Sequence, residues 1–249
     1  MGLFKRKKKE KPIPRIYSLP LLCAIPCTFV VGWGCLYSLY LMMHQFRLPL
    51  NLWASAIAGF SGASLLLIRL ELGRTKTLIH ELKHACMVIL TGNVLKGISV
   101  SKHSGEVKYE IYENSLHSAS LIALAPYFMP LLSLPTLIAA LLLESGESSL
   151  WALALGATLG IDLTTAFSEM RPEQTDFKKI LGGFLASGCY LAGFHFMWVS
   201  VVAIWFMGGQ AAYIYTGRVF LSGAEAIATM LYPGLAEQIH EIIDTIFGP

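Results

Sequence analysis

The stretch "LIHELKHACM", residues 78–87, determines how the rest of the chain is interpreted. Its two histidines, His80 and His84, are four residues apart, so on a helix both side chains project from one face, at the spacing at which two imidazoles share one Zn²⁺ ion. Glu81 lies beside that face and is suited to act as the general base for a zinc-bound water, whose pKa the metal lowers to about 7. We therefore predict a metal site with His80 and His84 as ligands and Glu81 as the catalytic residue.

This stretch belongs to a very apolar chain. Of the 249 residues, 55% are hydrophobic and 14% are charged, and the mean hydropathy is +0.58, whereas soluble domains are roughly 25% charged. A helix needs roughly 20 residues to cross the hydrocarbon layer. Apolar runs of about this length fall at 18–43, 50–70, 77–95, 118–143, 150–168 and 180–207. The sequence thus predicts an all-α polytopic membrane protein with about six transmembrane or re-entrant helices.

A different pattern separates the third run from the fourth. The segment "GISVSKHSGEVKYEIYE", residues 97–113, places apolar side chains at alternate positions on both sides of a Ser104-Gly105 turn, which is the period of a β-hairpin. The alternating residues are Ile98, Val100, Val107, Tyr109 and Ile111. We predict a small cytoplasmic or interfacial β-hairpin here, and an edge strand of it is suited to hold an extended peptide by β-addition.

The fourth run is interrupted by proline. It contains Pro126, Pro130 and Pro135, and proline breaks or bends a helix because it lacks the backbone N–H. Hydrolysis within a bilayer requires a polar pocket that is open to water and screened from lipid. We expect the bent helix to lie beside such a pocket.

The two ends of the chain are less apolar than its centre. Residues 1–17 form a basic N-terminus with seven Lys or Arg residues among the first fifteen. This is a signal-anchor pattern that keeps the N-terminus in the cytoplasm and favours anionic lipid over nucleic acid as its partner. We predict a transmembrane domain over 18–207 and a tail over 208–249, where an amphipathic helix lies on the bilayer surface or packs against the domain.

Basic residues constrain the topology, because cytoplasmic loops collect Lys and Arg. If the third run crossed the membrane, the basic residues of the next two polar segments would lie outside. These residues are Lys96, Lys102, Lys108, Arg171, Lys178 and Lys179. We infer that the third run starts and ends on the cytoplasmic side, or that one earlier run is not a span. Lys83 is expected to reach the cytoplasmic interface by snorkelling.

A catalytic zinc usually has three protein ligands, so one more ligand must come from elsewhere in the chain. Asp162 lies within the apolar fifth run and has no basic residue near it in sequence, and a buried carboxylate is costly unless an ion compensates its charge. We predict Asp162 as the third metal ligand and Asp176 as the alternative, whose other role would be to cap an interfacial helix. Glu169 and His195 are less favoured, and His195 is expected to be a hydrogen-bonded packing residue.

Together, the HELKH helix, the following hairpin and the later intramembrane aspartate resemble the site-2 protease family of intramembrane zinc metalloproteases, as a divergent bacterial-type member. The resemblance covers about 75–180, the metalloprotease-like core. It implies that His80, His84 and Asp162 hold Zn²⁺, that Glu81 activates water, and that peptide bonds of transmembrane substrates are cut near the cytoplasmic side in regulated intramembrane proteolysis. In many members the aspartate follows Asn-Pro and precedes Gly, whereas here it stands in Gly160-Ile161-Asp162-Leu163.

Two other classes of function remain open. A chain that keeps the protease fold can serve as a non-catalytic binding or regulatory subunit, which would share the zinc ligands. A transporter with a fortuitous motif would bind no metal at all. The expected partners are a transmembrane protein substrate and the lipid bilayer, with a regulatory membrane partner or a homo-oligomer as open alternatives. The expected location is a prokaryotic plasma membrane.

Overall fold

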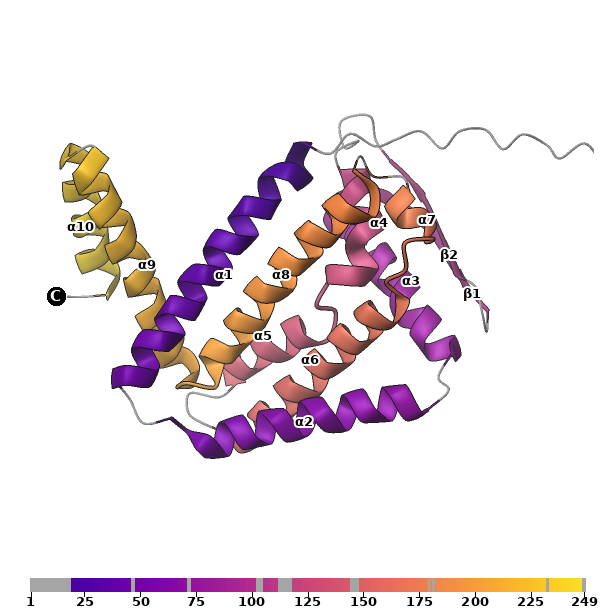
Figure 1. Cartoon of the computed structure of the whole chain (residues 1–249), viewed down its shortest axis with the longest axis horizontal. Coiled ribbons are helices and arrows are strands. Elements are labelled where there is room, and N and C mark those ends of the chain that lie inside the picture. The colour runs from indigo at the N-terminus through magenta and orange to yellow at the C-terminus, as the bar shows by residue number, and fades with distance from the viewer. Residues whose placement is uncertain are drawn as a thin grey trace, which may run out of the picture.

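The computed structural model describes residues 19–45, 48–70, 73–101, 105–111, 118–143, 148–178, 180, 182–231 and 233–247. The described chain is mainly helical, with one two-stranded sheet (Figure 1). In order, the elements are α1 Leu19–Gln45, α2 Leu50–Arg69, α3 Gly73–Leu90, β1 Val94–Val100, β2 Gly105–Glu110, α4 Ser118–Phe128, α5 Ser133–Leu143, α6 Ser149–Glu169, α7 Thr175–Lys178, α8 Gly183–Trp205, α9 Gly209–Leu231 and α10 Pro233–Phe247. The basic segment 1–17 lies outside the described residues.

Four of the described helices are long and apolar enough to cross a membrane, namely α1 over Cys23–Gln45, α2, α6 and α8. The pair α4–α5 adds a fifth if it is counted as one bent span. The HELKH helix α3 is not among them, since it carries the charged residues Arg74, Lys76, Glu81 and Lys83. The described helices are therefore compatible with a membrane protein of four or five spans, and the sequence-based number of about six is reached only by including α3.

Helix α3 and the hairpin occupy the segment predicted as the third apolar run and the strands after it. The prediction placed the end of this helix near residue 95, but α3 ends at Leu90, because Gly92 has a left-handed φ of +72° and turns the chain into β1. The strands are antiparallel, and Ile98 pairs with Val107. The hairpin prediction is confirmed, and its first strand begins earlier than expected.

Proline breaks the fourth apolar run as predicted. Helices α4 and α5 meet at an angle of 78°, with Pro126 inside α4 and Pro130 in the break between the two helices. Met129 and Leu134 still donate backbone hydrogen bonds across the break, to Ala125 and Pro130. The bend turns the end of α4 and the start of α5 toward α3 and α6.

Small residues allow α2 and α6 to pack closely, side by side (Figure 1). A methyl group on Gly156 would overlap the carbonyl oxygen of Ala56, and one on Gly59 would overlap that of Leu153. Close backbone approach of this kind is a usual mode of helix association in membranes, where lipid is as apolar as the side chains. The α2–α6 pair thus fixes the position of α6, which carries Asp162 and Glu169.

Helix α8 joins the remaining parts of the bundle. Its far end packs Trp198, Val202 and Trp205 against α2, α5 and α6, and its first turns pack Tyr190 and Leu191 against α4 and α7. Helix α1 lies along α8 (Figure 1). The cluster around α4 and α7 supports the segment that carries Asp176.

The tail after residue 208 forms two helices, α9 and α10, which pack against each other beside α1 (Figure 1). His240 of α10 lies 3.1 Å from Glu225 of α9. The predicted tail helix is therefore present, and it packs on a neighbouring helix of the same chain.

We predict that Gly156→Ala lowers the free energy of unfolding by about 1–3 kcal/mol, because the added methyl group must push α2 and α6 apart. The matched control is Gly62→Ala on α2, since nothing lies within 4 Å of the methyl group that it adds. That change should leave stability unchanged or raise it, because alanine favours helix over glycine. Denaturation of the micellar protein, followed by circular dichroism, measures both. Equal stability of the two variants would contradict the close α2–α6 contact.

Candidate metal centre

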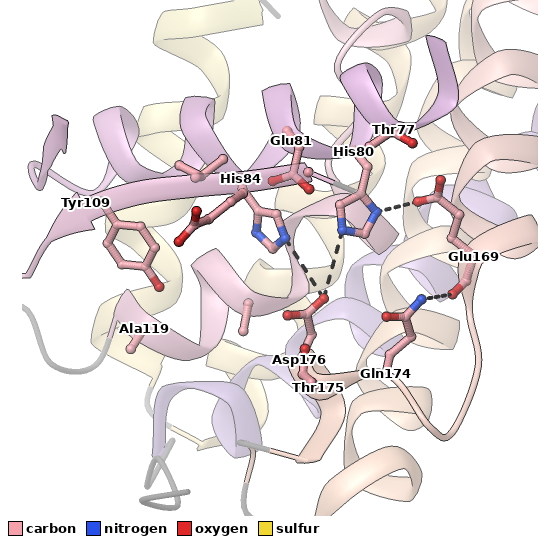
Figure 2. Close-up of a pocket in the computed structure, with 14 residues that line it drawn as sticks. Thr77, His80, Glu81, His84, Tyr109, Ala119, Glu169, Gln174, Thr175 and Asp176 are labelled. Carbon is pink, nitrogen blue, oxygen red and sulfur yellow. Dashed lines mark hydrogen bonds and ion pairs between the residues drawn. The ribbon is translucent and has the colours of Figure 1, made fainter. Parts of the chain in front are cut away.

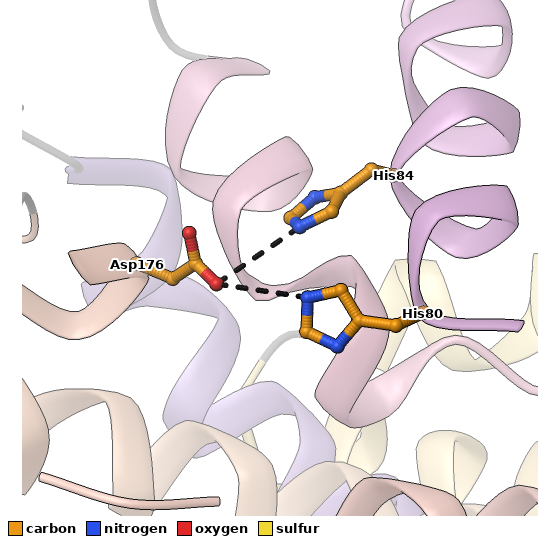
Figure 3. A group of neighbouring side chains, drawn as sticks. All are labelled: His80, His84 and Asp176. Atoms are coloured by element: carbon orange, nitrogen blue, oxygen red, sulfur yellow. Dashed lines mark ion pairs between the residues drawn. The ribbon is translucent and has the colours of Figure 1, made fainter. Parts of the chain in front are cut away.

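His80 and His84 lie one turn apart on α3, and their ring centroids are 5.0 Å apart. Both rings face the carboxylate of Asp176 on the short helix α7 (Figure 3). The Nε2 atoms of His80 and His84 each lie 3.9 Å from Asp176 Oδ2, and the three possible ligand atoms all lie within 4.8 Å of one another. Three ligand atoms at tetrahedral angles around zinc would be roughly 3.4 Å apart, so a small contraction would bring this group to metal-binding geometry.

The other nitrogen of each imidazole is bound to a different acceptor. His80 Nδ1 contacts the Glu169 carboxylate at the end of α6 (Figure 2), and His84 Nδ1 lies 2.7 Å from the backbone carbonyl of Ile122 on α4. Because a carbonyl and a carboxylate can only accept, both Nδ1 atoms carry the proton. In the neutral form of each ring the lone pair of Nε2 then faces Asp176, and such outer hydrogen bonds are typical of metal-binding histidines.

Asp176 is held in place by its neighbours. The hydroxyl of Tyr127 donates to Asp176 Oδ2 over 3.1 Å, and the Tyr127 ring packs on Phe177, the next residue of α7. Tyr127 and Phe177 are both almost fully buried. The aromatic contact therefore anchors α7, and the hydroxyl orients the carboxylate toward the histidines.

Glu81 lies beside the histidines, in a cavity of about 470 Å³ (Figure 2). Residues of α3, β2, α4, α6 and the segment at α7 line it: Thr77, His80, Glu81, His84, Gly105, Glu106, Val107, Tyr109, Ala119, Ala123, Glu169, Gln174, Thr175 and Asp176. The backbone of Gly105 packs so closely on the Glu81 carboxylate that a methyl group there would overlap it. Glu81 is only 6% exposed.

Electrostatics in the cavity reflect the four carboxylates that line it, Glu81, Glu106, Glu169 and Asp176. Burial raises the pKa of Glu81, the charge of His80 opposes this shift, and the carboxylates of Asp176 and Glu169 add to it. Burial lowers the pKa of His80, but the hydrogen bond to Glu169 and the surrounding carboxylates outweigh it, so its pKa is raised. The excess of negative charge makes the cavity favourable for a cation.

Asp162, predicted as the third ligand, has other partners. Its carboxylate accepts hydrogen bonds from the backbone N–H groups of Leu132 and Ser133, at 3.1 and 2.8 Å, and from the Ser133 hydroxyl at 2.8 Å. Lys83 Nζ lies 3.6 Å from its Oδ1. Asp162 thus has a basic partner, although none is near it in sequence, because Lys83 comes from α3. The structure instead brings Asp176, the alternative, to His80 and His84.

Lys83 does not reach the protein surface. Its side chain is 1% exposed, and its Nζ donates to the backbone carbonyl of Pro126 over 3.4 Å. The snorkelling expected from the sequence is therefore wrong. A buried acceptor pair, the Pro126 carbonyl and Asp162, compensates the charge inside the bundle.

The two less favoured candidates take supporting positions. Glu169 lies behind His80 and contacts Nδ1, on the side away from Asp176 (Figure 2). His195 lies on α8 and packs its ring against Phe167 and Phe194, which agrees with the packing part of its expected role as a hydrogen-bonded packing residue. Among the described residues, its Nε2 is buried without a hydrogen-bond partner.

The sequence did not predict two contacts of the candidate centre, the hydrogen bond of Tyr127 to Asp176 and the contact of Glu169 with His80 Nδ1. Tyr127 stands in an apolar run, where only its hydroxyl distinguishes it, and Glu169 was considered only as a direct ligand. Both roles depend on contacts between segments far apart in sequence.

Comparison of the chain with protein-family models, with curated proteins and with solved structures finds no match.

Proposed function

We propose that the chain is an intramembrane zinc metalloprotease that hydrolyses peptide bonds of transmembrane substrates near the cytoplasmic side. The observation that supports it best is the convergence of His80, His84 and Asp176 next to Glu81, in one cavity. Two imidazoles and one carboxylate are a usual ligand set of catalytic zinc, and they leave a fourth position for water. The resemblance of the HELKH helix and hairpin to site-2 proteases supports the same reaction.

In this proposal Glu81 moves the proton. A zinc ion held by the three ligands would lower the pKa of its water and polarise the peptide carbonyl. Glu81, adjacent to the ligands, accepts the proton from the attacking water and passes it to the leaving amine. Its raised pKa makes the carboxylate a stronger base, and a pKa shifted toward the working pH suits a group that must both accept a proton and return it. Glu169 and the Ile122 carbonyl keep the histidines in the ligating tautomer.

A substrate segment would be bound in extended form along β2. Four residues of this strand line the cavity, namely Gly105, Glu106, Val107 and Tyr109. Strand β1 pairs with one edge of β2, and among the described strands nothing pairs with the other edge. Helical peptide bonds are shielded by their own turn, so an unwound substrate that adds to this edge would present its backbone to Glu81.

The proposed setting is a prokaryotic plasma membrane with the N-terminus, the hairpin and the α6–α7 segment in the cytoplasm. The basic residues of these segments support this orientation. The α4–α5 break and the hairpin would let cytoplasmic water reach the cavity while α2, α6 and α8 screen it from lipid.

The second candidate is a non-catalytic binding subunit with the same fold. One observation favours it: Glu81 is almost fully buried beneath Gly105. A chain that never opens this contact would bind metal but not process a substrate. Activity separates the two candidates, whereas metal binding does not.

We predict about one zinc per chain in the purified protein, measured by elemental analysis after exhaustive dialysis. His80→Ala, His84→Ala and Asp176→Asn should each reduce the content to near zero, because each removes a ligand. Glu173→Gln, an exposed carboxylate of the same segment, is the matched control and should keep the zinc. Glu169→Gln should keep the stoichiometry but lower the affinity roughly 10- to 100-fold, as expected for an outer hydrogen bond. A zinc-free wild type would refute the metal site.

We predict that Glu81→Gln keeps the zinc and stops cleavage, because the amide keeps the size of the side chain but cannot accept the proton. The measurement compares membrane-protein fragments in cells that express wild type or Glu81→Gln. A single-span protein cut near its cytoplasmic end only with wild type would establish protease activity and identify a substrate. Identical fragment profiles across growth and stress conditions, with zinc in both proteins, would favour the binding subunit.

We predict that cysteines introduced at Lys108 and Glu173, both exposed, react only after the cytoplasmic side is opened to a membrane-impermeant maleimide. The lysine and arginine content of 96–113 and 169–179 motivates this orientation. A cysteine in place of Gln210, near the start of α9, is the comparison. The proposed topology places this position on the opposite side of the membrane, so it should react with the maleimide from outside intact cells. Labelling of position 108 or 173 from outside intact cells would rule out the proposed topology.

A further inference from the structure

The prolines of the α4–α5 break leave two backbone carbonyls without their helical donors. In an α-helix the N–H of each residue donates to the carbonyl four residues earlier. Pro126 has no N–H, so the carbonyl of Ile122 lacks this donor, and Pro130 leaves the carbonyl of Pro126 without one in the same way. In an apolar bundle such carbonyls need other partners.

Both carbonyls accept from neighbouring residues of α3. His84 Nδ1 donates to the Ile122 carbonyl over 2.7 Å, and Lys83 Nζ donates to the Pro126 carbonyl over 3.4 Å. The two acceptors are one helical turn apart on α4. The contact between α3 and α4 is thus made at the two positions from which the prolines removed the N–H.

These contacts restrain the rotation of α3 about its axis. Successive side chains on a helix are roughly 100° apart, so Lys83 projects on one side of the His80–His84 face and Glu81 on the other. A rotation of α3 would break both hydrogen bonds to α4 and would also separate Lys83 from Asp162, which is 3.6 Å away. The direction of the histidines and Glu81 is therefore set by the His84 contact on their own face and by the Lys83 contacts on the flank away from Glu81.

The second half of the break strengthens this arrangement. Asp162 accepts from the N–H groups of Leu132 and Ser133, at the start of α5, and Trp198 Nε1 donates to the Ser133 hydroxyl over 3.0 Å. Residues before the break thus provide carbonyl acceptors to α3, and residues after it provide N–H donors to Asp162 of α6. The ion pair between Lys83 and Asp162 connects α3 to α6 at the break.

We infer that Pro126 and Pro130 are positioning residues of the metal centre: by withholding backbone N–H groups, they leave the carbonyls that hold His84 and Lys83, and so direct the histidine Nε2 atoms at Asp176. The importance of this role for chemistry rests on the proposed metalloprotease function. The hydrogen bond of His84 is a property of the protein without metal and can be tested separately.

The decisive variant is Pro126→Ala. Its new N–H competes with His84 for the Ile122 carbonyl, so the zinc affinity should fall roughly 10- to 100-fold, whereas thermal stability should stay equal or rise because alanine suits a helix interior. A merely structural proline would instead give affinity and stability that fall together. Pro135→Ala in α5 is the matched control, since Pro135 is exposed and no described contact joins it to α3; its affinity should match wild type.

A second measurement does not depend on metal. Nitrogen-15 NMR of the zinc-free protein with labelled histidine, with the signal of His84 identified from His84→Gln, reports which ring nitrogen carries the proton. Wild type and Pro135→Ala should show His84 protonated at Nδ1, and Pro126→Ala should shift this signal toward a mixture of tautomers. If Pro126→Ala does not fold, Pro130→Ala, which restores an N–H to the Pro126 carbonyl, should lower the zinc affinity measurably through Lys83.

The outcomes separate the two proposals. A wild type that binds no zinc would overturn the proposed function, while the His84 signal would still decide the role of Pro126. Unchanged affinity and an unchanged His84 signal in Pro126→Ala would overturn the inference and leave the proposed function standing. Parallel losses of affinity and stability, with the His84 signal unchanged, would also overturn it.

Discussion

An apolar bundle supplies no water to unpaired polar groups, so each buried charge on α3 and each buried backbone group freed by proline must find its partner inside the protein. Helix α3 brings His80, Glu81, Lys83 and His84 into this environment. The α4–α5 break brings two carbonyls and two N–H groups. His84 and Lys83 of α3 donate to the two carbonyls, and Asp162 of α6 accepts from the two N–H groups. The carboxylates of Glu169 and Asp176 provide the remaining partners of the histidines.

Three carboxylates around α3 have different partners because they lie at different positions along the α6–α7 segment. Asp162, inside α6, lies beside the break and pairs with Lys83. Glu169, at the end of the same helix, contacts the outer nitrogen of His80, and Asp176, on α7, faces the inner nitrogens of both histidines. One buried pair, one supporting hydrogen bond and one candidate metal ligand thus come from a single segment of the chain.

Close helix packing fixes the positions of these carboxylates relative to α3. The glycine contacts between α2 and α6 leave little room for sliding, and the aromatic contact of Tyr127 with Phe177 fixes α7 against α4. Since a shift of about 1 Å in a catalytic group is enough to slow a reaction about 100-fold, a centre built on packed helices is better suited to chemistry than one built on loops. The strand β2 closes the remaining side, over Glu81.

Features that depend on local order can be predicted from the amino-acid sequence: the helical spacing of His80 and His84, the alternation of the hairpin, the apolar helices and the proline break. Each of these follows from a repeat of two or 3.6 residues or from a missing N–H, which a short stretch of chain contains in full. The third candidate ligand could not be chosen in this way, because Asp162 and Asp176 are both acidic residues near apolar helices and differ only in what other helices bring to them. Lys83 is distant from Asp162 in sequence but adjacent in space, so the pairing of Asp162 with a lysine and the approach of Asp176 to the histidines result from the packing of distant helices.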